Sequence, residues 1–201
     1  MIPTNKFKDR AIKNMWLGLI CLLFSLLTLG IYYQQHLMAA SLLTFTDQTQ
    51  AANLTATHMT TNPNGIRNMI SGMTAADFDG DGWVDLFVLG GGATADSLFI
   101  NQGDGTFQEE AAQWGLAAIH QGAGAATGDF NHDGWIDLYV TSHGPGNQPT
   151  KGQHRLYRNN GDRTFTNIAT TAGVNQTNDQ TADGYGAVFG DYDLDGDLDL
   201  L

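Results

Sequence analysis

Three segments of the chain carry acidic or amide side chains at the first, third, fifth and ninth positions of a nine-residue stretch. They read DFDGDGWVD, DFNHDGWID and DYDLDGDLD. The candidate ligands are Asp77, Asp79, Asp81 and Asp85, then Asp129, Asn131, Asp133 and Asp137, and finally Asp191, Asp193, Asp195 and Asp199. Two carboxylates about 5 Å apart repel by roughly 3 kcal/mol at an effective dielectric constant of about 20. A folded loop that holds four such groups therefore requires a countercharge.

The ligand chemistry indicates which cation would supply that charge. All candidate ligands offer hard oxygen atoms, which Ca²⁺ prefers, whereas Zn²⁺ favours histidine and cysteine and Mg²⁺ retains most of its waters. The sixth position is glycine in every copy (Gly82, Gly134 and Gly196), which permits a sharp turn that directs the seventh carbonyl inward. The loops therefore predict about one Ca²⁺ each.

Two other readings of these loops are weaker. An EF-hand loop ends in a bidentate glutamate at position twelve, where the first two copies have Val88 and Val140, and it requires flanking helices. A solvated acidic turn is the default for a single copy. Here, however, all three copies share an aliphatic residue at position eight and leucine at position ten.

The loops belong to a longer repeat, with loop-to-loop periods of 52 and 62 residues. Each unit reads as four short strands, at 72–76, 84–89, 97–101 and 106–110 in the first copy, and the last two surround a glycine-containing hairpin turn. The corresponding hairpin strands of the second copy are 155–159 and 164–168. The extra residues of the second period fall at 142–153 and 175–186, which are rich in turn formers and predict surface loops.

A four-stranded unit repeated about every 50 residues predicts an all-β fold and is typical of β-propeller blades. A β-sandwich is the alternative, although it would not need matching loops at a fixed period. The blade units are 72–118, 123–174 and 186–201, or about two and a half blades. The segment that starts at Phe45 matches the ends of the later units and predicts an orphan last strand, so the propeller region is 45–201. Because propellers need about four to eight blades, we expect the chain to be a fragment of a longer protein.

The N-terminal region predicts export. Residues 15–33 carry no charge and would span about 28 Å as a helix, close to the thickness of a bilayer core. Basic residues dominate the preceding segment 1–14, which the positive-inside rule places in the cytoplasm. The prediction is a transmembrane signal anchor at 15–33, a linker at 34–44 and an extracytoplasmic remainder in the periplasm or at the cell surface. Secretion after cleavage of a signal peptide is one alternative, and a purely structural helix buried in a core is another.

The composition excludes several functional classes. The chain has 201 residues and a formal net charge of −12, so its surface repels nucleic-acid phosphates. Its single cysteine, Cys21, rules out a disulfide framework within the chain. The sequence contains no H-E-x-x-H, G-x-S-x-G or Walker motif. We therefore predict neither an enzyme nor a nucleic-acid-binding protein.

The pattern GDFNHDGWIDLYV followed by LYRNNGDRTF resembles the FG-GAP/VCBS repeats of integrin-α-like propellers, in particular the group similar to cartilage acidic protein. The resemblance covers about residues 45–201. It implies a calcium-binding, typically seven-bladed propeller outside the cytoplasm, with ions bracing the first hairpin of each blade and partners on the propeller face. The chain departs from this pattern by supplying too few blades.

The resulting functional prediction is a calcium-binding, membrane-anchored, non-catalytic module for adhesion or for binding an extracytoplasmic protein or carbohydrate. The alternative is a calcium-stabilised propeller portion of a larger secreted enzyme whose catalytic domain lies beyond Leu201.

Overall fold

The computed structural model describes residues 24–29, 44–58, 71–145, 153–175 and 181–201. The chain divides into two compact units, residues 1–46 and 47–201. In the first unit, residues 24–29 are helical and exposed, whereas the rest of the predicted span 15–33, the segment 1–14 and nearly all of the linker lie outside the described residues. Within the described ranges, no helix is long and apolar enough to cross a membrane.

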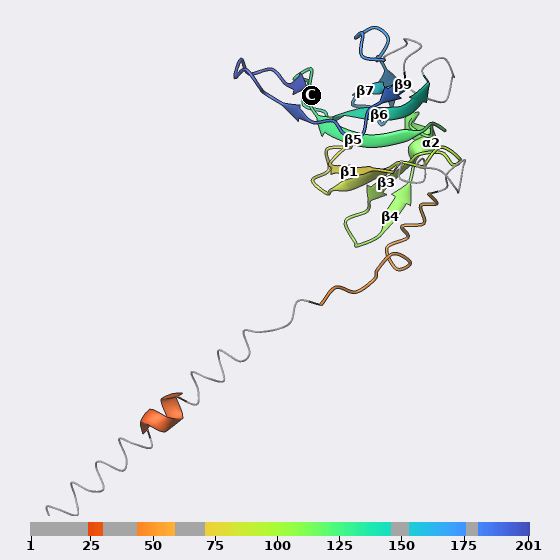
Figure 1. The fold of residues 1–201 in the computed structure, drawn as a ribbon. Coiled ribbons are helices and arrows are strands. Elements are labelled where there is room, and N and C mark those ends of the chain that lie inside the picture. The colour runs from red at the N-terminus through yellow and green to blue at the C-terminus, as the bar shows by residue number, and fades with distance from the viewer. Residues whose placement is uncertain (1–23, 30–43, 59–70, 146–152, 176–180) are drawn as a thin grey trace, which may run out of the picture. The chain divides into compact units, whose positions relative to one another are not determined.

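The first repeat unit forms a four-stranded antiparallel sheet in which sequential strands pair (Figure 1). Its strands are β1 (Met73–Ala76), β2 (Asp85–Val88), β3 (Ser97–Asn101) and β4 (Phe107–Glu109). A one-turn helix, α2 (Ala111–Trp114), follows β4 and ends at Gly115, whose φ of 77° suits glycine. The four strands were predicted from the sequence, whereas the short helix was not.

The second repeat unit forms the same sheet with one additional strand. Its strands are β5 (Gly122–Gly128), β6 (Asp137–Pro145), β7 (Arg155–Asn159) and β8 (Phe165–Asn167), and β9 (Thr181–Asp183) pairs with the end of β6. The prediction of surface loops at 142–153 and 175–186 was therefore wrong in part. Strand β6 extends into the first insertion, 142–153. Strand β9, from the second insertion, 175–186, pairs with this extension and satisfies its backbone N–H and C=O groups.

A third antiparallel hairpin is formed by β10 (Phe189–Gly190) and β11 (Asp199–Leu200). The first strands of successive units lie close together, since Thr74 Oγ1 on β1 is 3.4 Å from Thr127 Oγ1 on β5. A Cβ atom on Gly124 would lie 2.7 Å from the carbonyl oxygen of Tyr185. This close approach explains why β5 consists of small residues.

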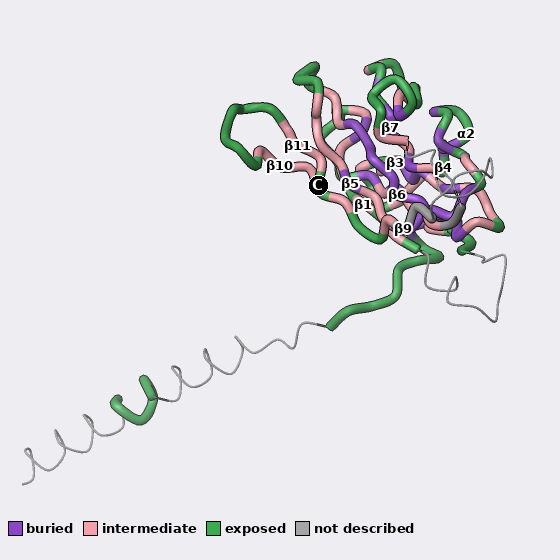
Figure 2. Tube along the Cα trace, turned by 45° about the horizontal axis from the view of Figure 1, so that its top comes forward, coloured by how far each residue is buried: buried purple, intermediate pink, exposed green. Residues whose placement is uncertain are grey.

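The apolar core lies between the sheets, and Figure 2 shows buried residues along the strands and exposed residues along the loops. Residues on β6 alternate between two clusters: Leu138 and Val140 join the first sheet's core, and Tyr139 packs toward Phe189 and Leu200 of the third hairpin. The second sheet is thus covered on both faces. A two-layer sandwich covers only one face of each sheet, whereas an all-β array of stacked sheets is consistent with propeller blades.

The segment that begins at Phe45 forms the turn that follows the predicted last strand, but not the strand. Residues 44–48 carry no strand and Phe45 is 98% exposed, so the strand itself is not formed in the described structure. The turn that follows is formed, because Leu54 N donates to Thr49 O at 2.9 Å, as Leu116 N does to Ala111 O at 2.8 Å. Its Ala52 carbonyl accepts a hydrogen bond from the N–H of Phe107 on β4 at 3.0 Å. The turn therefore packs against the first sheet.

Candidate metal centres in the three acidic loops

Each acidic loop connects the first two strands of its unit, and the first-position carboxylate shapes the loop. Asp77 Oδ1 accepts hydrogen bonds from the N–H groups of Gly80 at 2.8 Å and Asp81 at 3.1 Å, and its Oδ2 accepts one from Gly82 at 2.9 Å. Asp129 and Asp191 accept the corresponding bonds from the fifth and sixth residues of their loops. The three loops therefore have one fold, built around the first aspartate.

The third and fifth positions follow the same rule, because one side-chain oxygen of each accepts a backbone N–H two residues later. In the first loop these bonds join Asp79 to Asp81 N at 3.2 Å and Asp81 to Trp83 N at 2.8 Å. The equivalent acceptors are Asn131 and Asp133 in the second loop, and Asp193 and Asp195 in the third. The backbone thus fixes the direction of every candidate ligand at these positions.

The ninth-position aspartates of the first two loops are fully buried, and the corresponding residue of the third loop is half-buried. Asp85 is fully buried and accepts hydrogen bonds from Phe78 N at 2.9 Å and Asn101 N at 2.8 Å. Asp137 is also fully buried, and Asp199 accepts the equivalent bond from Tyr192 N at 2.8 Å. Burial raises the pKa of Asp85 and of Asp137 to about 6, although backbone hydrogen bonds oppose the shift. In the cation-free protein these side chains therefore take up protons more readily than an ordinary aspartate does.

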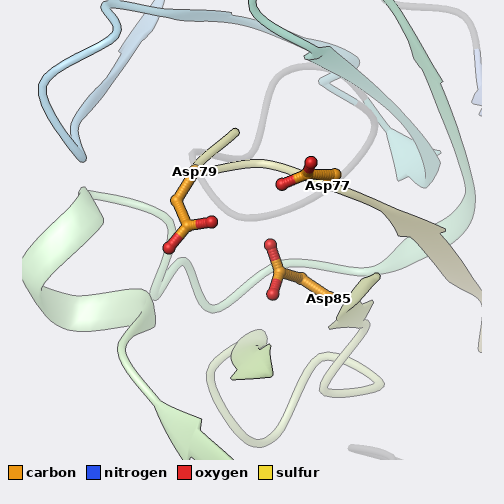
Figure 3. Close-up of side chains that lie close together, drawn as sticks. All are labelled: Asp77, Asp79 and Asp85. Atoms are coloured by element: carbon orange, nitrogen blue, oxygen red, sulfur yellow. The ribbon is translucent and has the colours of Figure 1, made fainter. Parts of the chain in front are cut away.

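The loop fold brings carboxylates together. Asp77, Asp79 and Asp85 each place a carboxylate oxygen within 4.8 Å of the others, and Figure 3 shows the three groups pointing toward one another. The third loop gathers its first, third and fifth positions instead, Asp191, Asp193 and Asp195, so Asp81 and Asp199 lie outside these groups of three. The second loop holds an amide at its third position and shares the hydrogen bonds of the others. Such all-oxygen clusters fit Ca²⁺.

Two backbone positions in each loop adopt left-handed conformations. The sixth-position glycines have φ values between 90° and 98°, as the sequence predicted. The fourth position is also left-handed, and there the second and third loops have His132 with φ 56° and Leu194 with φ 62°. This position could not be predicted from the sequence, because only the first loop has a glycine there, Gly80.

Neighbouring loops touch each other through one repeated contact. The seventh residue of each later loop lies against the fourth residue of the loop before it. A Cβ atom on Gly80 would lie 3.1 Å from the ring of Trp135, and Asp197 Oδ1 lies 3.5 Å from His132 Nδ1. The three candidate centres therefore form a connected series.

Asn159, at the end of β7, connects the first and second loops most directly. Its side-chain amide donates to Phe78 O at 2.9 Å and to Ile136 O at 3.2 Å, and its backbone N–H donates to Asp137 Oδ1 at 2.8 Å. Asn101 makes the matching bonds within the first unit, to Val84 O and to Asp85. Among the described residues, Asn159 alone of these two asparagines is hydrogen bonded to a preceding loop.

Arg163 adds an ion pair between the first and second repeat units. Its Nη2 lies 2.7 Å from Asp79 Oδ2, and the side chain of Asp79 is 2% exposed. Burial raises the pKa of Asp79, and the guanidinium partly opposes that shift. Arg163 has φ 64° at the turn position where the first unit has Gly105, so it occupies a left-handed conformation that glycine adopts more easily. Sequence reasoning missed both Asn159 and Arg163.

Comparison with known proteins supports the repeat that was identified in the sequence. Residues 77–140 and 146–201 match the model of a family described as FG-GAP-like repeat. Cartilage acidic protein 1 of Xenopus tropicalis is 41% identical over 78 residues, which cover 36% of this chain and 11% of that protein. The Homo sapiens and Mus musculus proteins of the same name are 47% identical over 62 residues, or 30% of this chain and 8% of each relative. The matched segments thus span 8–11% of these relatives. Because the family model covers more than half of the chain and the four-stranded units with their acidic loops agree with it, the chain belongs to the FG-GAP-like repeat family, as predicted.

Proposed function

We propose that the protein is a calcium-binding, extracytoplasmic, membrane-anchored β-propeller that serves as a non-catalytic adhesion or binding module. The observation that carries this proposal is the loop that is built three times with the same backbone hydrogen bonds to its carboxylates. FG-GAP-like repeats suggest an extracellular module of the adhesion type. Orienting so many carboxylates toward common points is unfavourable unless a cation joins them.

The residues that would hold calcium are the twelve candidate ligands predicted from the sequence. When bound, Ca²⁺ supplies positive charge that offsets the mutual repulsion of the carboxylates. The protein fixes the positions of the ligands. The ninth-position aspartate lies at the start of the second strand, while the first-position aspartate organises the turn. The loop thereby ties the first two strands of each unit together.

Calcium titration of the full-length protein by isothermal calorimetry tests the proposal. We expect Asp133→Ala to reduce the number of bound ions by one, because its side chain is the fifth-position ligand of the second loop. Asp104→Ala is the matched control, since Asp104 is an exposed carboxylate that caps the β3–β4 turn by accepting hydrogen bonds from Thr106 N at 2.9 Å and Thr106 Oγ1 at 2.6 Å. An unchanged stoichiometry in Asp133→Ala, or an equal loss in both variants, would contradict the ligand assignment.

The membrane anchor is supported by the uncharged run 15–33 and the basic residues before it. A reporter that is active only outside the cytoplasm, fused after Gln50, should be active in cells. The same reporter fused after Lys13 should be inactive, because it would precede the span. Activity of the second fusion, or inactivity of the first in correctly expressed protein, would refute the proposed export.

The partner is proposed to be an extracytoplasmic protein or carbohydrate, bound on a face of a closed ring of about seven blades. The net charge of −12 argues against nucleic acid. Electron microscopy of the full-length protein would count the blades. Arrays of glycans and cell-surface proteins, probed with and without chelator, would show whether binding depends on calcium, and binding that persists in chelator would contradict the proposal.

A further inference from the structure

A groove of about 390 Å³ lies at the seam between the end of the first unit and the second sheet. One wall consists of small residues that include Ala112, Ala117 and Ala118, and the other carries Arg155, Tyr157 and Asn167. Arg155 begins β7, whereas Asn159, which contacts the acidic loops, ends it. Four residues of extended strand separate the two by about 13 Å, so the groove is distinct from the candidate metal centres.

The polar groups of the groove share one face of the second sheet. Tyr157 and Asn167 are cross-strand partners, and Arg155 lies two residues before Tyr157, which places all three on the same side. The Asn167 side-chain oxygen is used by Ala169 N at 3.1 Å, which leaves its NH₂ group available. The wall therefore offers a guanidinium, a phenolic hydroxyl and an amide NH₂.

The guanidinium of Arg155 has few partners within the protein. Its Nε is enclosed and has no hydrogen-bond partner among the described residues, and Nη1 reaches only the Tyr157 hydroxyl, at 3.5 Å. No described carboxylate lies within ion-pair distance of it, whereas Arg163 pairs with Asp79. The buried carboxylate of Asp96 is engaged by Gly90 N at 2.9 Å and by His120 Nε2 at 2.7 Å. An enclosed donor of a charged group without a partner is unfavourable and calls for an acceptor.

The first repeat unit shows that the sheet does not require these residues. The same three positions are occupied there by Ser97, Phe99 and Glu109, and Phe99 pairs with Glu109 in the same register. Glu109 Oε1 accepts hydrogen bonds from Leu98 N at 3.1 Å and Ala111 N at 3.0 Å. The second unit thus replaces an acid with an amide and adds a cation, on a chain that is otherwise acidic.

We propose that this groove binds the carboxylate of a short aliphatic acid, of the kind presented by a glutamate side chain of a partner peptide. A guanidinium fork matches the two oxygens of a carboxylate, and a single cation balances a single negative charge better than the two charges of sulfate. The alanine wall suits methylene groups and offers no hydroxyl partners for a sugar ring. The proposal is independent of calcium binding.

Saturation-transfer NMR of the full-length protein tests this with N-acetylglutamate α-amide as the probe and N-acetylglutamine α-amide as its neutral isostere. We expect saturable binding of the acid, with a dissociation constant of about 1 mM, and at least about tenfold weaker binding of the isostere. Glucuronate and sulfate, measured in the same way, should bind more weakly than the glutamate probe. No saturable binding, or tighter binding of glucuronate or sulfate, would overturn the assignment.

Two arginine variants locate the site. Arg155→Ser introduces the first unit's residue and should weaken binding of the acid about tenfold. Arg158→Ser removes the same charge from an exposed arginine on the other face of β7, whose Nη2 lies 3.4 Å from Asn160 Oδ1, and should leave binding unchanged. If Arg155→Ser fails to fold by circular dichroism, Arg155→Lys and Tyr157→Phe replace it, and each should weaken binding severalfold. Full binding in the folded Arg155 variants, or equal losses in Arg158→Ser, would refute the site.

Discussion

Removal of calcium should lower the melting temperature of the full-length protein by about 15 °C or more. Each filled site contributes about 2.7 kcal/mol when free calcium is a hundred times the dissociation constant. Three such sites sum to about 8 kcal/mol, and 1 kcal/mol changes the melting temperature of a domain of this size by about 2–4 °C. Differential scanning calorimetry in calcium and in a calcium chelator would measure the difference.

The pH dependence of the calcium-free protein gives this experiment an internal control. Burial raises the pKa of Asp85 and Asp137 to about 6, which is above the value of an aspartate in the unfolded chain. The folded state therefore binds protons more tightly, so its stability is greater below the unfolded pKa and is lost as the pH rises through about 6. Acidification from about pH 7.5 to pH 5 should then raise the melting temperature in chelator and weaken calcium binding.

Magnesium provides the second control, because Mg²⁺ demands a small octahedral site and retains its waters. We expect millimolar magnesium to restore little of the lost stability. A melting curve that is the same in calcium and in chelator would rule out a structural role for calcium. If magnesium stabilised the calcium-free protein as much as calcium does, the result would point to simple charge screening.

The Asn159→Ala variant should be strongly destabilising, although Asn159 is not one of the candidate ligands. Asn159 is 1% exposed, and its side chain serves the carbonyls of Phe78 and Ile136 and the N–H of Gly161. Each buried group left without a partner costs about 1–3 kcal/mol, so we expect a loss of about 3–5 kcal/mol in the free energy of unfolding. Urea unfolding in saturating calcium would measure it.

Asn101→Ala is the matched control for this substitution. Asn101 makes the same bonds within its own unit, to Val84 O at 3.0 Å and from Gly103 N at 3.0 Å, but among the described residues it makes none to a preceding loop. We expect a loss of about 1–2 kcal/mol, and the difference between the variants reflects the bond between units together with the deeper burial of Asn159. Asn159→Ala should also weaken calcium binding in two loops and Asn101→Ala in one. Equal effects of the two variants would show that the bond to Phe78 contributes nothing.

The sequence predicted the parts of the structure that depend on local pattern. The spacing of carboxylates and glycine identified the three loops, and alternation between turn residues and apolar runs located β1 to β4 within one or two residues. These features depend on contacts between residues that are near one another in the chain. The positions of the candidate ligands could therefore be identified from the repeat alone, because each loop organises its own carboxylates.

The features that sequence reasoning missed depend on how one sheet stacks against the next. The pairing of Arg163 with Asp79 joins residues 84 apart, and the hydrogen bond from Asn159 to Phe78 joins residues 81 apart. No local period predicts which residues such stacking brings together. One signal was available for Asn159, since the third strand of both described four-stranded units ends in asparagine. Its hydrogen bond to the preceding loop still required the structure.

The contacts between loops all reach backward along the chain. Trp135, Asn159 and Arg163 belong to the second unit, yet they cover Gly80, Phe78 and Asp79 of the first loop. During synthesis the first loop therefore emerges from the ribosome well before the residues that complete its surroundings. The surroundings of the first loop are therefore complete only when the second unit has been made and folded, although the loop organises its own carboxylates. The second unit thus adds its contacts to the first in an order that runs from the N-terminus toward the C-terminus.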